Sequence, residues 1–481
     1  MIYSNYIAGQ WQDPGSAGTF PVSDPATGEV FAEVAVATAE DIRHAIDGAE
    51  SVRADWAALP AIERSTIMRR AAAIMMERID ELAEILVHEQ GKPFVQAKGE
   101  ITYGCGFLDW FAEEGRRAYG QTIPASVSDK RIIIIRQPIG ISVAITPWNF
   151  PSLQLLRKLG AALGAGCPMI AKPAELTPLS ALEIARAFDD AGLPKGVLSV
   201  VCAPEPYDFT DVIMEDPRVR AISFTGSTEV GKILMRRGAD HVKKVSLELG
   251  GHAPTIVFED ADLDVVVVEI MASKFRNMGQ TCVSVNRIYA HHTVIDELAS
   301  RLQEAMKNLS LGEGMDPNTG VGPLIEPAAI DKVERHVADA VAKGATVVVG
   351  GNRGSSAHLK SAQFFEPTLL VGVDETMLVM QEETFGPVAP IISFEDEADV
   401  VARANHTPYG LSSYVFTRDI NRAIRVSEAL EFGTVGINDA TFSAVQAPFG
   451  GYKESGLGRE GGSLGLDEFM EYKFISIGHV G

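Results

Sequence analysis

The alternation of β-prone and helical segments between Ile139 and about Asp260 constrains the fold more than any other feature. Strands are expected at 139–146, 168–172, 197–201, 219–224 and 244–247, and helices at 152–164, 180–191, 209–214 and 227–238. Strands that alternate with helices run parallel, because each crossover helix returns the chain to the same edge of the sheet. The sequence therefore predicts a doubly wound α/β fold, in which ligands gather at the carboxyl ends of the strands.

A second α/β unit is predicted from about Gly251 to Phe442. Its expected strands are 255–258, 286–290, 346–350 and 390–394, and its expected helices are 263–277, 294–309, 330–343 and 421–430. Upstream, the capping-box spacing of Thr38 and Asp41 predicts a helix start. Two further helices are expected at 61–90 and 95–119. At ~150 residues per unit, 481 residues suggest roughly three units.

The β-branched run from Lys130 to Arg136 is apolar but bracketed by charge. A strand of this kind, isolated from the alternating pattern, favours pairing outside its own domain, and we expect a subunit contact there. The alternative is an ordinary buried strand. The polar loop from Gly351 to Gln363 is expected to be mobile.

The charge of the chain excludes several kinds of partner. A formal net charge of −22 and a pI near 4.9 argue against binding to nucleic acid or to an anionic membrane. The sequence shows neither a secretory leader nor a run of ~18 apolar residues. Four unpatterned cysteines fit a reducing, cytoplasmic setting, and no Cys/His spacing indicates a metal site. Any anionic ligand would have to be met by local cations.

Cys282 is the best candidate nucleophile among the four cysteines. Cys105, Cys167 and Cys202 have apolar or small neighbours typical of inert packing, whereas Cys282 closes the polar stretch that begins at Gly279. A single cysteine is more often an inert thiol, so a second motif is needed. Glu248, which ends an apolar strand and precedes two glycines, is a plausible general base whose pKa burial would raise.

Other strand ends carry residues suited to an oxyanion and to a dinucleotide. Asn149 can donate to a developing oxyanion, although a turn-stabilising role is the alternative. Gly226 and Ser227 join a strand to a helix, where N–H groups suit a phosphate, or simply cap the helix. Lys172 and Glu175 either form an exposed ion pair or hold ribose hydroxyls, and a carboxylate there repels a 2′-phosphate.

Taken together, these motifs resemble the aldehyde dehydrogenase superfamily over essentially the whole chain. The matching stretches are Thr146–Pro151, Lys172–Glu175, Phe224–Gly231, Glu248–Gly251, Gly279–Cys282, Glu382–Pro387 and Pro448–Gly451. The resemblance implies a Rossmann-like cofactor-binding domain (1–118 and 138–250), an α/β catalytic domain (251–448) and a small β oligomerisation domain (119–137 and 449–481). It also implies a homodimer or homotetramer.

The resemblance also implies residue roles. Cys282 would be the nucleophile, Glu248 the general base and Asn149 the oxyanion donor. Cofactor contacts would come from Trp148, Lys172, Glu175, Gly226, Ser227, Glu383 and Phe385. The aldehyde would become a thiohemiacetal on Cys282, then a thioester, and finally a carboxylic acid. We expect NAD to be preferred and NADP to be tolerated at most.

Within that superfamily the chain is most similar to succinate-semialdehyde dehydrogenases. The similar stretches are Trp110–Gly115, Arg136–Gly140, Lys274–Arg276 and Gly456–Gly461. This similarity implies that Arg157, Arg287 and Ser443 grip a substrate carboxylate, the alternative being that both arginines lie on the surface.

Two departures bear on the substrate. Ser284 stands where many of these enzymes carry a second cysteine, so no redox-switch disulfide is expected. The differing loop from Asn438 to Gln446 leaves succinate semialdehyde, glutarate semialdehyde, 2-oxoglutarate semialdehyde and a sulfonated aldehyde such as sulfolactaldehyde open.

Two rival functions are less well supported by the sequence. A cofactor-free cysteine hydrolase needs a histidine partner, and none lies near either motif in sequence. A non-catalytic relative would not be expected to keep Cys282, Glu248 and Asn149 together.

Overall fold

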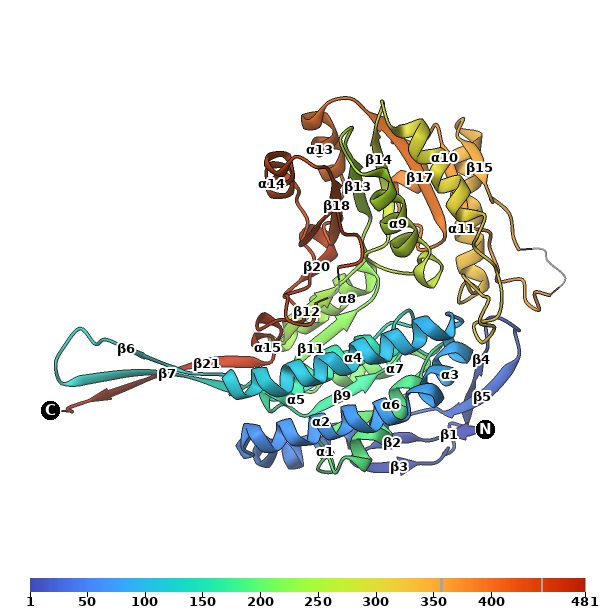
Figure 1. Ribbon diagram of the computed structural model, residues 1–481. Coiled ribbons are helices and arrows are strands. Elements are labelled where there is room, and N and C mark those ends of the chain that lie inside the picture. The colour runs from blue at the N-terminus through green and yellow to red at the C-terminus, as the bar shows by residue number, and fades with distance from the viewer. Residues whose placement is uncertain (355–357, 443, 481) are drawn as a thin grey trace.

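The computed structural model describes residues 1–354, 358–442 and 444–480. Two large α/β bodies lie against each other, and a thin β arm projects from the first (Figure 1). Their cores are separate clusters of buried apolar side chains. Within the described residues, no helix combines the length and hydropathy needed to cross a membrane.

The first body contains an eight-stranded sheet in the order β20-β12-β11-β8-β9-β10-β2-β3. Its parallel centre confirms the predicted alternation and consists of β8 (Ile141–Ile145), β9 (Met169–Lys172), β10 (Leu198–Val200), β11 (Val219–Thr225) and β12 (Lys244–Glu248). The antiparallel edge strands are β2 (Asn5–Ile7), β3 (Gln10–Gln12) and β20 (Gly456–Leu457). A separate small sheet holds β1 (Ile2–Tyr3), β4 (Thr19–Ser23) and β5 (Val30–Ala35).

Helices cover this sheet on both faces (Figure 1). They are α1 (Ala39–Ala58), α4 (Phe94–Glu114), α5 (Pro151–Ala165), α6 (Leu179–Asp190), α7 (Pro206–Glu215) and α8 (Thr228–Gly238). The capping box of Thr38 and Asp41 is present at the start of α1. Every residue of α5 is buried, so this helix is the central packing element of the body.

The helix predicted at 61–90 is in fact two helices, α2 (Ala61–Glu77) and α3 (Ile79–Gln90). The backbone leaves helical geometry at Arg78, whose guanidinium lies 2.7 Å from both Glu81 and Glu183. This break lets α2 and α3 each turn an apolar face to the core. The apolar periodicity continues through position 78, so the sequence carried no sign of the break.

The second body contains a seven-stranded sheet in the order β15-β16-β17-β14-β13-β18-β19. The strands are β13 (Ala253–Val257), β14 (Val285–His291), β15 (Thr346–Val349), β16 (Thr368–Val371), β17 (Val388–Phe394), β18 (Ser412–Phe416) and β19 (Thr434–Ile437). All are parallel except the edge strand β15. Strands β16, β18 and β19 are only four or five residues long and were not predicted from the sequence.

Helices α9 (Leu263–Lys274), α10 (Ile295–Met306), α11 (Pro327–Ala342), α12 (Leu378–Gln381), α13 (Glu397–Asn405) and α14 (Ile420–Ala429) flank this sheet. Helix α9 ends three residues before the predicted 277. Asn277 and Met278 have φ values of 50° and 57°, in the left-handed region, which an α-helix cannot continue through. The 3₁₀ turn Arg276–Gly279 therefore redirects the chain before Cys282.

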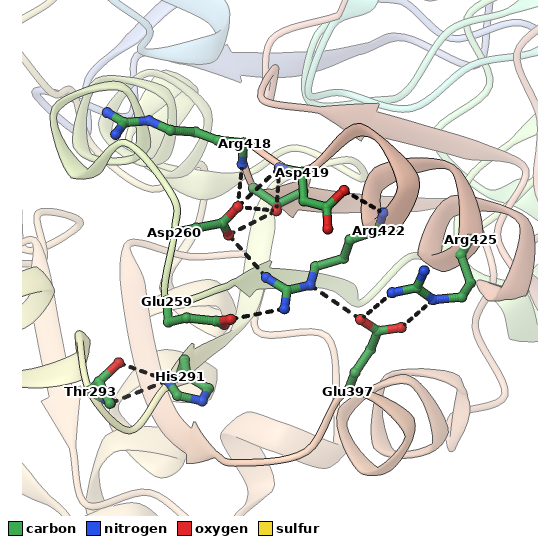
Figure 2. A network of polar contacts seen from close by, with 10 residues as sticks. Glu259, Asp260, His291, Thr293, Glu397, Arg418, Asp419, Arg422 and Arg425 are labelled. Atoms are coloured by element: carbon green, nitrogen blue, oxygen red, sulfur yellow. Dashed lines mark hydrogen bonds and ion pairs between the residues drawn. The ribbon is translucent and has the colours of Figure 1, made fainter.

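The carboxyl ends of β13 and β18 are closed by an ion-pair network rather than open to a ligand (Figure 2). Arg422 on α14 contacts Glu259, Asp260 and Glu397 at 2.8, 3.1 and 3.2 Å. Arg422 also lies 4.4 Å from the Phe258 ring. In this sheet the candidate site must therefore lie at the opposite, amino edge.

The arm is a three-stranded sheet of β6 (Gln121–Ile123), β7 (Lys130–Pro138) and the C-terminal strand β21 (Met470–Gly478). Strand β7 pairs antiparallel with β21 over nine residues, from Met470↔Pro138 to Gly478↔Lys130. The isoleucine run thus finds a partner more than 300 residues away in the same chain. The short helix α15 (Leu464–Asp467) precedes β21.

Candidate active site

The two motifs that the sequence singled out meet in space. A Cβ added to Gly251 would lie 2.4 Å from the carbonyl oxygen of Cys282, so only glycine permits this approach. Gly279 has φ +73° and packs equally closely on the carbonyl of Gly386. The carboxyl edge of the first sheet and the amino edge of the second are thereby joined around Cys282.

Cys282 is the half-buried cysteine, whereas Cys105, Cys167 and Cys202 are buried. It lines two cavities at once, one of about 540 Å³ and one of about 360 Å³. Burial, followed by the nearby Glu383 and Glu248 carboxylates, raises the pKa of its thiol to about 12. The sulfur is thus accessible from both cavities but is held as a thiol in this arrangement.

Asn149 lies at the wall between the first sheet and Cys282 and lines the smaller cavity. Its Nδ2 donates to the carbonyl of Gln280 at 3.0 Å, and its Oδ1 accepts from the N–H of Phe150 at 3.1 Å. The amide is therefore fixed, with one N–H left to face a ligand. This geometry suits an oxyanion donor.

Glu248 ends β12 and is buried, as its position after an apolar strand suggested. Neither of its carboxylate oxygens has a hydrogen-bond partner among the described residues. Burial, followed by the charge of Glu460, raises its pKa well above the ordinary value. A buried carboxyl without a partner favours the protonated form or a bound water.

The smaller cavity has the walls expected of a dinucleotide site. Trp148 and Phe385 meet edge to face at 5.4 Å between ring centroids, and both line it. Ser227 caps α8 by accepting from the N–H of Val230, and Gly226 precedes it at the end of β11. A Cβ on Gly226 would lie 2.4 Å from the Phe224 ring, so the strand can enter the helix here only through glycine.

Glu383 is fixed in the same cavity. Its Oε1 accepts from the N–H of Gly251 at 3.1 Å, and burial raises its pKa to about 7. Trp148, Gly226, Ser227, Glu383 and Phe385 are thus brought together from three distant segments. The first-turn N–H groups of α8 can meet a pyrophosphate and Glu383 can accept ribose hydroxyls, so these residues fit a nicotinamide dinucleotide.

Lys172 and Glu175 lie at the carboxyl end of β9, beside this cavity rather than in its wall. Lys172 is buried, with its Nζ 3.2 Å from the carbonyl of Pro173 and 3.8 Å from Glu175. Glu175 is 45% exposed, so it is free to meet a ligand that extends past the cavity. Burial lowers the pKa of Lys172.

The larger cavity lies on the other side of Cys282 and contains Arg157. Its guanidinium lies 3.3 Å from Glu460 and within 5 Å of the Phe107 and Phe449 rings. Lys158, fully buried, also pairs with Glu460. Two cations therefore face one carboxylate, and the group keeps a net positive charge while Glu248 is protonated.

The predicted role of Arg287 is wrong in this structure. The residue does not line the larger cavity, and its guanidinium donates to the carbonyls of His252 and Ala404, each at 2.9 Å. Arg287 lies within β14, where residues alternate between faces, and its side chain points into the core of the second body. Spacing from Cys282 alone could not reveal this direction.

Arg276, rather than Arg287, is the second arginine beside the larger cavity. It lines the larger cavity, 5.4 Å from the Phe150 ring, and its Nε has no hydrogen-bond partner among the described residues. The stretch Lys274–Arg276 was among those that resemble succinate-semialdehyde dehydrogenases, so the sequence held a signal for Arg276 although no role was predicted for it. Lys332 on α11, which lines the cofactor-side cavity, carried no such signal. Ser443 lies outside the described residues.

Among the described residues, no three His, Cys, Asp or Glu groups lie close enough to hold an ion. The adjacent His291 and His292 stand at the far end of β14, away from Cys282.

Two cavities that meet at one cysteine, at the junction of two α/β bodies, fit an enzyme that brings a cofactor and a substrate together at a nucleophile. The chain belongs to the aldehyde dehydrogenase family. The sequence model described as "Aldehyde dehydrogenase family" matches residues 11–475. This membership confirms the resemblance seen in the sequence.

The chain is 50% identical over 472 residues to succinate-semialdehyde dehydrogenase [NADP(+)] GabD of Escherichia coli, covering 98% of this chain and 97% of that protein. It is 49% identical to glutarate-semialdehyde dehydrogenase of Pseudomonas aeruginosa, covering 99% and 97%. A crystal structure described as an E. coli NADP-dependent enzyme superposes with a TM-score of 0.97 at 50% identity, covering 99% and 98%. These likenesses confirm the aldehyde dehydrogenase fold.

Proposed function

We propose that this enzyme oxidises a short anionic aldehyde to its carboxylic acid, with succinate semialdehyde as the leading substrate. The observation that carries the proposal is the cationic lining of the larger cavity by Arg157 and Arg276, next to Cys282. In a chain of net charge −22, two guanidinium groups gathered beside one nucleophile indicate an anionic ligand. The far carboxylate of a semialdehyde is such a ligand, since it would be held there by charge-assisted pairing.

We propose the following steps for the reaction. Cys282 gives its proton to solvent and its sulfur adds to the aldehyde carbon to form a thiohemiacetal, while Asn149 and the Cys282 N–H donate to the oxygen. A nicotinamide dinucleotide held by Trp148, Glu383 and Phe385 would supply the hydride acceptor for oxidation of this adduct to a thioester on Cys282. In its deprotonated form, Glu248 then takes a proton from water, which attacks the thioester, and the carbon–sulfur bond breaks to release the acid and the thiolate.

Neighbouring substrates remain candidates because the cavity measures about 540 Å³. Glutarate semialdehyde, 2-oxoglutarate semialdehyde and a sulfonated three-carbon aldehyde all present one anion to the same arginines. The experiment is a steady-state panel of these aldehydes with butanal, which lacks the anion. Reduced nicotinamide should form with the wild type and not with Cys282→Ala, and kcat/KM for butanal should be far below that of the best anion. Equal kcat/KM values for butanal and the best anionic aldehyde would contradict the proposal that the enzyme prefers an anionic substrate.

Arg276, which lines the cavity, and Arg287, which does not, allow a matched pair of variants. Arg276→Gln should raise KM for the anionic aldehyde by about tenfold or more, because a charge-assisted hydrogen bond contributes about 1.5–3 kcal/mol. Arg287→Gln should leave that KM unchanged and lower the melting temperature, because its guanidinium holds buried carbonyls. If Arg287→Gln raised KM and Arg276→Gln did not, Arg287 and not Arg276 would be the residue that binds the substrate.

We further propose that NAD is preferred over NADP. Glu175, exposed at the end of β9, would repel a 2′-phosphate and accept ribose hydroxyls. Glu175→Ser should therefore lower KM for NADP relative to NAD. A wild type with the lower KM for NADP, like the cofactor named for the E. coli relative, would overturn this preference.

A further inference from the structure

Lys92 and Glu100 form a buried ion pair beside the candidate active site. Their side chains are 0% and 1% exposed. Lys92 lies in the turn between α3 and α4, and Glu100 lies in α4. Burying such a pair carries a large desolvation cost for each ion, so the pair contributes little net stability. Stability alone therefore does not explain why this ion pair lies in the core.

Glu100 holds the start of α5. Its Oε1 accepts from the N–H groups of Ser152 and Leu153 at 2.9 and 3.2 Å, while its Oε2 accepts from Lys92. A carboxylate on two N–H groups fixes both the position and the direction of a helix N-terminus. Helix α5 carries Gln154 and Arg157 into the aldehyde cavity.

Lys92 holds the backbone of Asn149. Its Nζ donates to the Asn149 carbonyl at 2.8 Å and lies 4.1 Å from the Phe150 ring centroid. The same carbonyl accepts from Nδ2 of Asn277 at 3.0 Å, and the Asn277 N–H donates to Gln96 on α4 at 2.9 Å. The peptide at Asn149 is thus fixed on one side by Lys92 and on the other by the turn before Cys282.

We propose that Lys92 and Glu100 are positioning residues that set the Asn149 amide and the first turn of α5 for the reaction. The proposal rests on the oxyanion role given to Asn149 under the proposed function. Glu100 reaches the wall of the aldehyde cavity, but both its oxygens are already engaged. The pair therefore acts through Asn149 and α5, not on the substrate itself.

The chain offers a matched control in Glu89. This buried glutamate accepts from the N–H groups of Leu179 and Ser180 at the start of α6, as Glu100 does at the start of α5. Among the described residues, Glu89 makes no hydrogen bond to Lys92 or to Asn149, although its charge acts on Lys92 through space. Burial raises the pKa of Glu89 to about 8. Glu100→Gln and Glu89→Gln therefore replace a carboxyl group by an amide at two helix starts, of which only the one at Glu100 is linked through Lys92 to Asn149.

The test measures kcat, KM, the dissociation constant of NAD and the melting temperature for Lys92→Met, Glu100→Gln and Glu89→Gln. Lys92→Met should lower kcat by about tenfold to a hundredfold, because small displacements of an oxyanion donor are costly, with NAD binding unchanged. Glu100→Gln should lower kcat less and raise KM for an anionic aldehyde. Glu89→Gln should lower the melting temperature alone.

A double-mutant cycle separates positioning from general destabilisation. Lys92→Met added to Asn149→Ala should cost nothing more in kcat, because the amide that Lys92 positions is already gone. Additive losses, or an unchanged kcat in folded Lys92→Met, would overturn the proposal. If Lys92→Met does not fold, equal kcat values in Glu100→Gln and Glu89→Gln would overturn it. An Asn149→Ala variant as fast as wild type would instead count against the proposed function.

Discussion

The chemistry depends on a thiol that burial makes a poor nucleophile at rest. Cys282 opens into two cavities, yet its surroundings and two nearby carboxylates raise its pKa to about 12. A raised thiol pKa means that the protonated form dominates at neutral pH.

This predicts a particular pH profile for alkylation of the cofactor-free enzyme. Between pH 7 and 9 the thiolate fraction rises about tenfold per pH unit, since both values lie below the pKa. The rate of iodoacetamide labelling of Cys282 should rise in the same way, with Cys282→Ser as the control. A plateau below pH 8 would show that the thiolate forms more easily than the surroundings imply.

The three other cysteines give an internal comparison at the same scale. Burial raises the pKa of Cys105, Cys167 and Cys202 as well, so pKa does not distinguish the reactive thiol. Access distinguishes it: Cys282 alone among these four is half-buried and borders cavities. The polar stretch that ends at Cys282 in the sequence reflects that access.

At the scale of elements, α4 and α5 form the packing unit behind the site. Gly160 and Gly164 on α5 allow close approach to α4. A Cβ on Gly164 would lie 2.8 Å from the carbonyl oxygen of Phe111. The two helices carry Gln96, Glu100, Gln154 and Arg157, so their separation affects the shape of the aldehyde cavity.

Gly164→Ala should therefore destabilise the protein by about 1–3 kcal/mol, the usual cost of overpacking a core. Gly99→Ala on α4 is the control, because nothing lies within 4 Å of its added Cβ. That change should stabilise by about 0.5–1 kcal/mol through helix propensity. Urea unfolding midpoints measure both, and a neutral Gly164→Ala would mean that the helices can separate at little cost.

At the scale of the whole molecule, the β arm is the part of the chain that lies outside the two large bodies. It projects from the first body (Figure 1). Two aromatic side chains on β21, Tyr472 and Phe474, are each 63% exposed. An exposed edge with large apolar groups is a typical pairing surface. The expected homodimer or homotetramer would cover it.

Phe474→Glu should then shift the sedimentation coefficient toward a smaller assembly, because a buried charge in the contact would be unpaired. Tyr207→Glu is the matched control, being an equally exposed aromatic at 66% on α7 of the first body. It should leave the assembly unchanged. An unaltered sedimentation coefficient for Phe474→Glu would place the subunit contact elsewhere.

The sequence by itself determined the doubly wound first sheet, the family and the strand-end motifs, because alternating periodicity and short glycine-bearing motifs are local signals. Gly279–Cys282 and Glu248–Gly251 were recognisable without coordinates because both need small residues at close backbone contacts.

Only the tertiary structure decided which way long side chains point. Arg287 and Arg276 lie five and six residues from Cys282, yet one pairs with core carbonyls and the other lines the cavity. Arg276 directly precedes the left-handed turn at Asn277 and Met278, whereas Arg287 lies within β14. Likewise, Lys92 reaches Asn149 and β7 reaches β21 across sequence separations that no local pattern spans, since such contacts form only when the whole chain has packed.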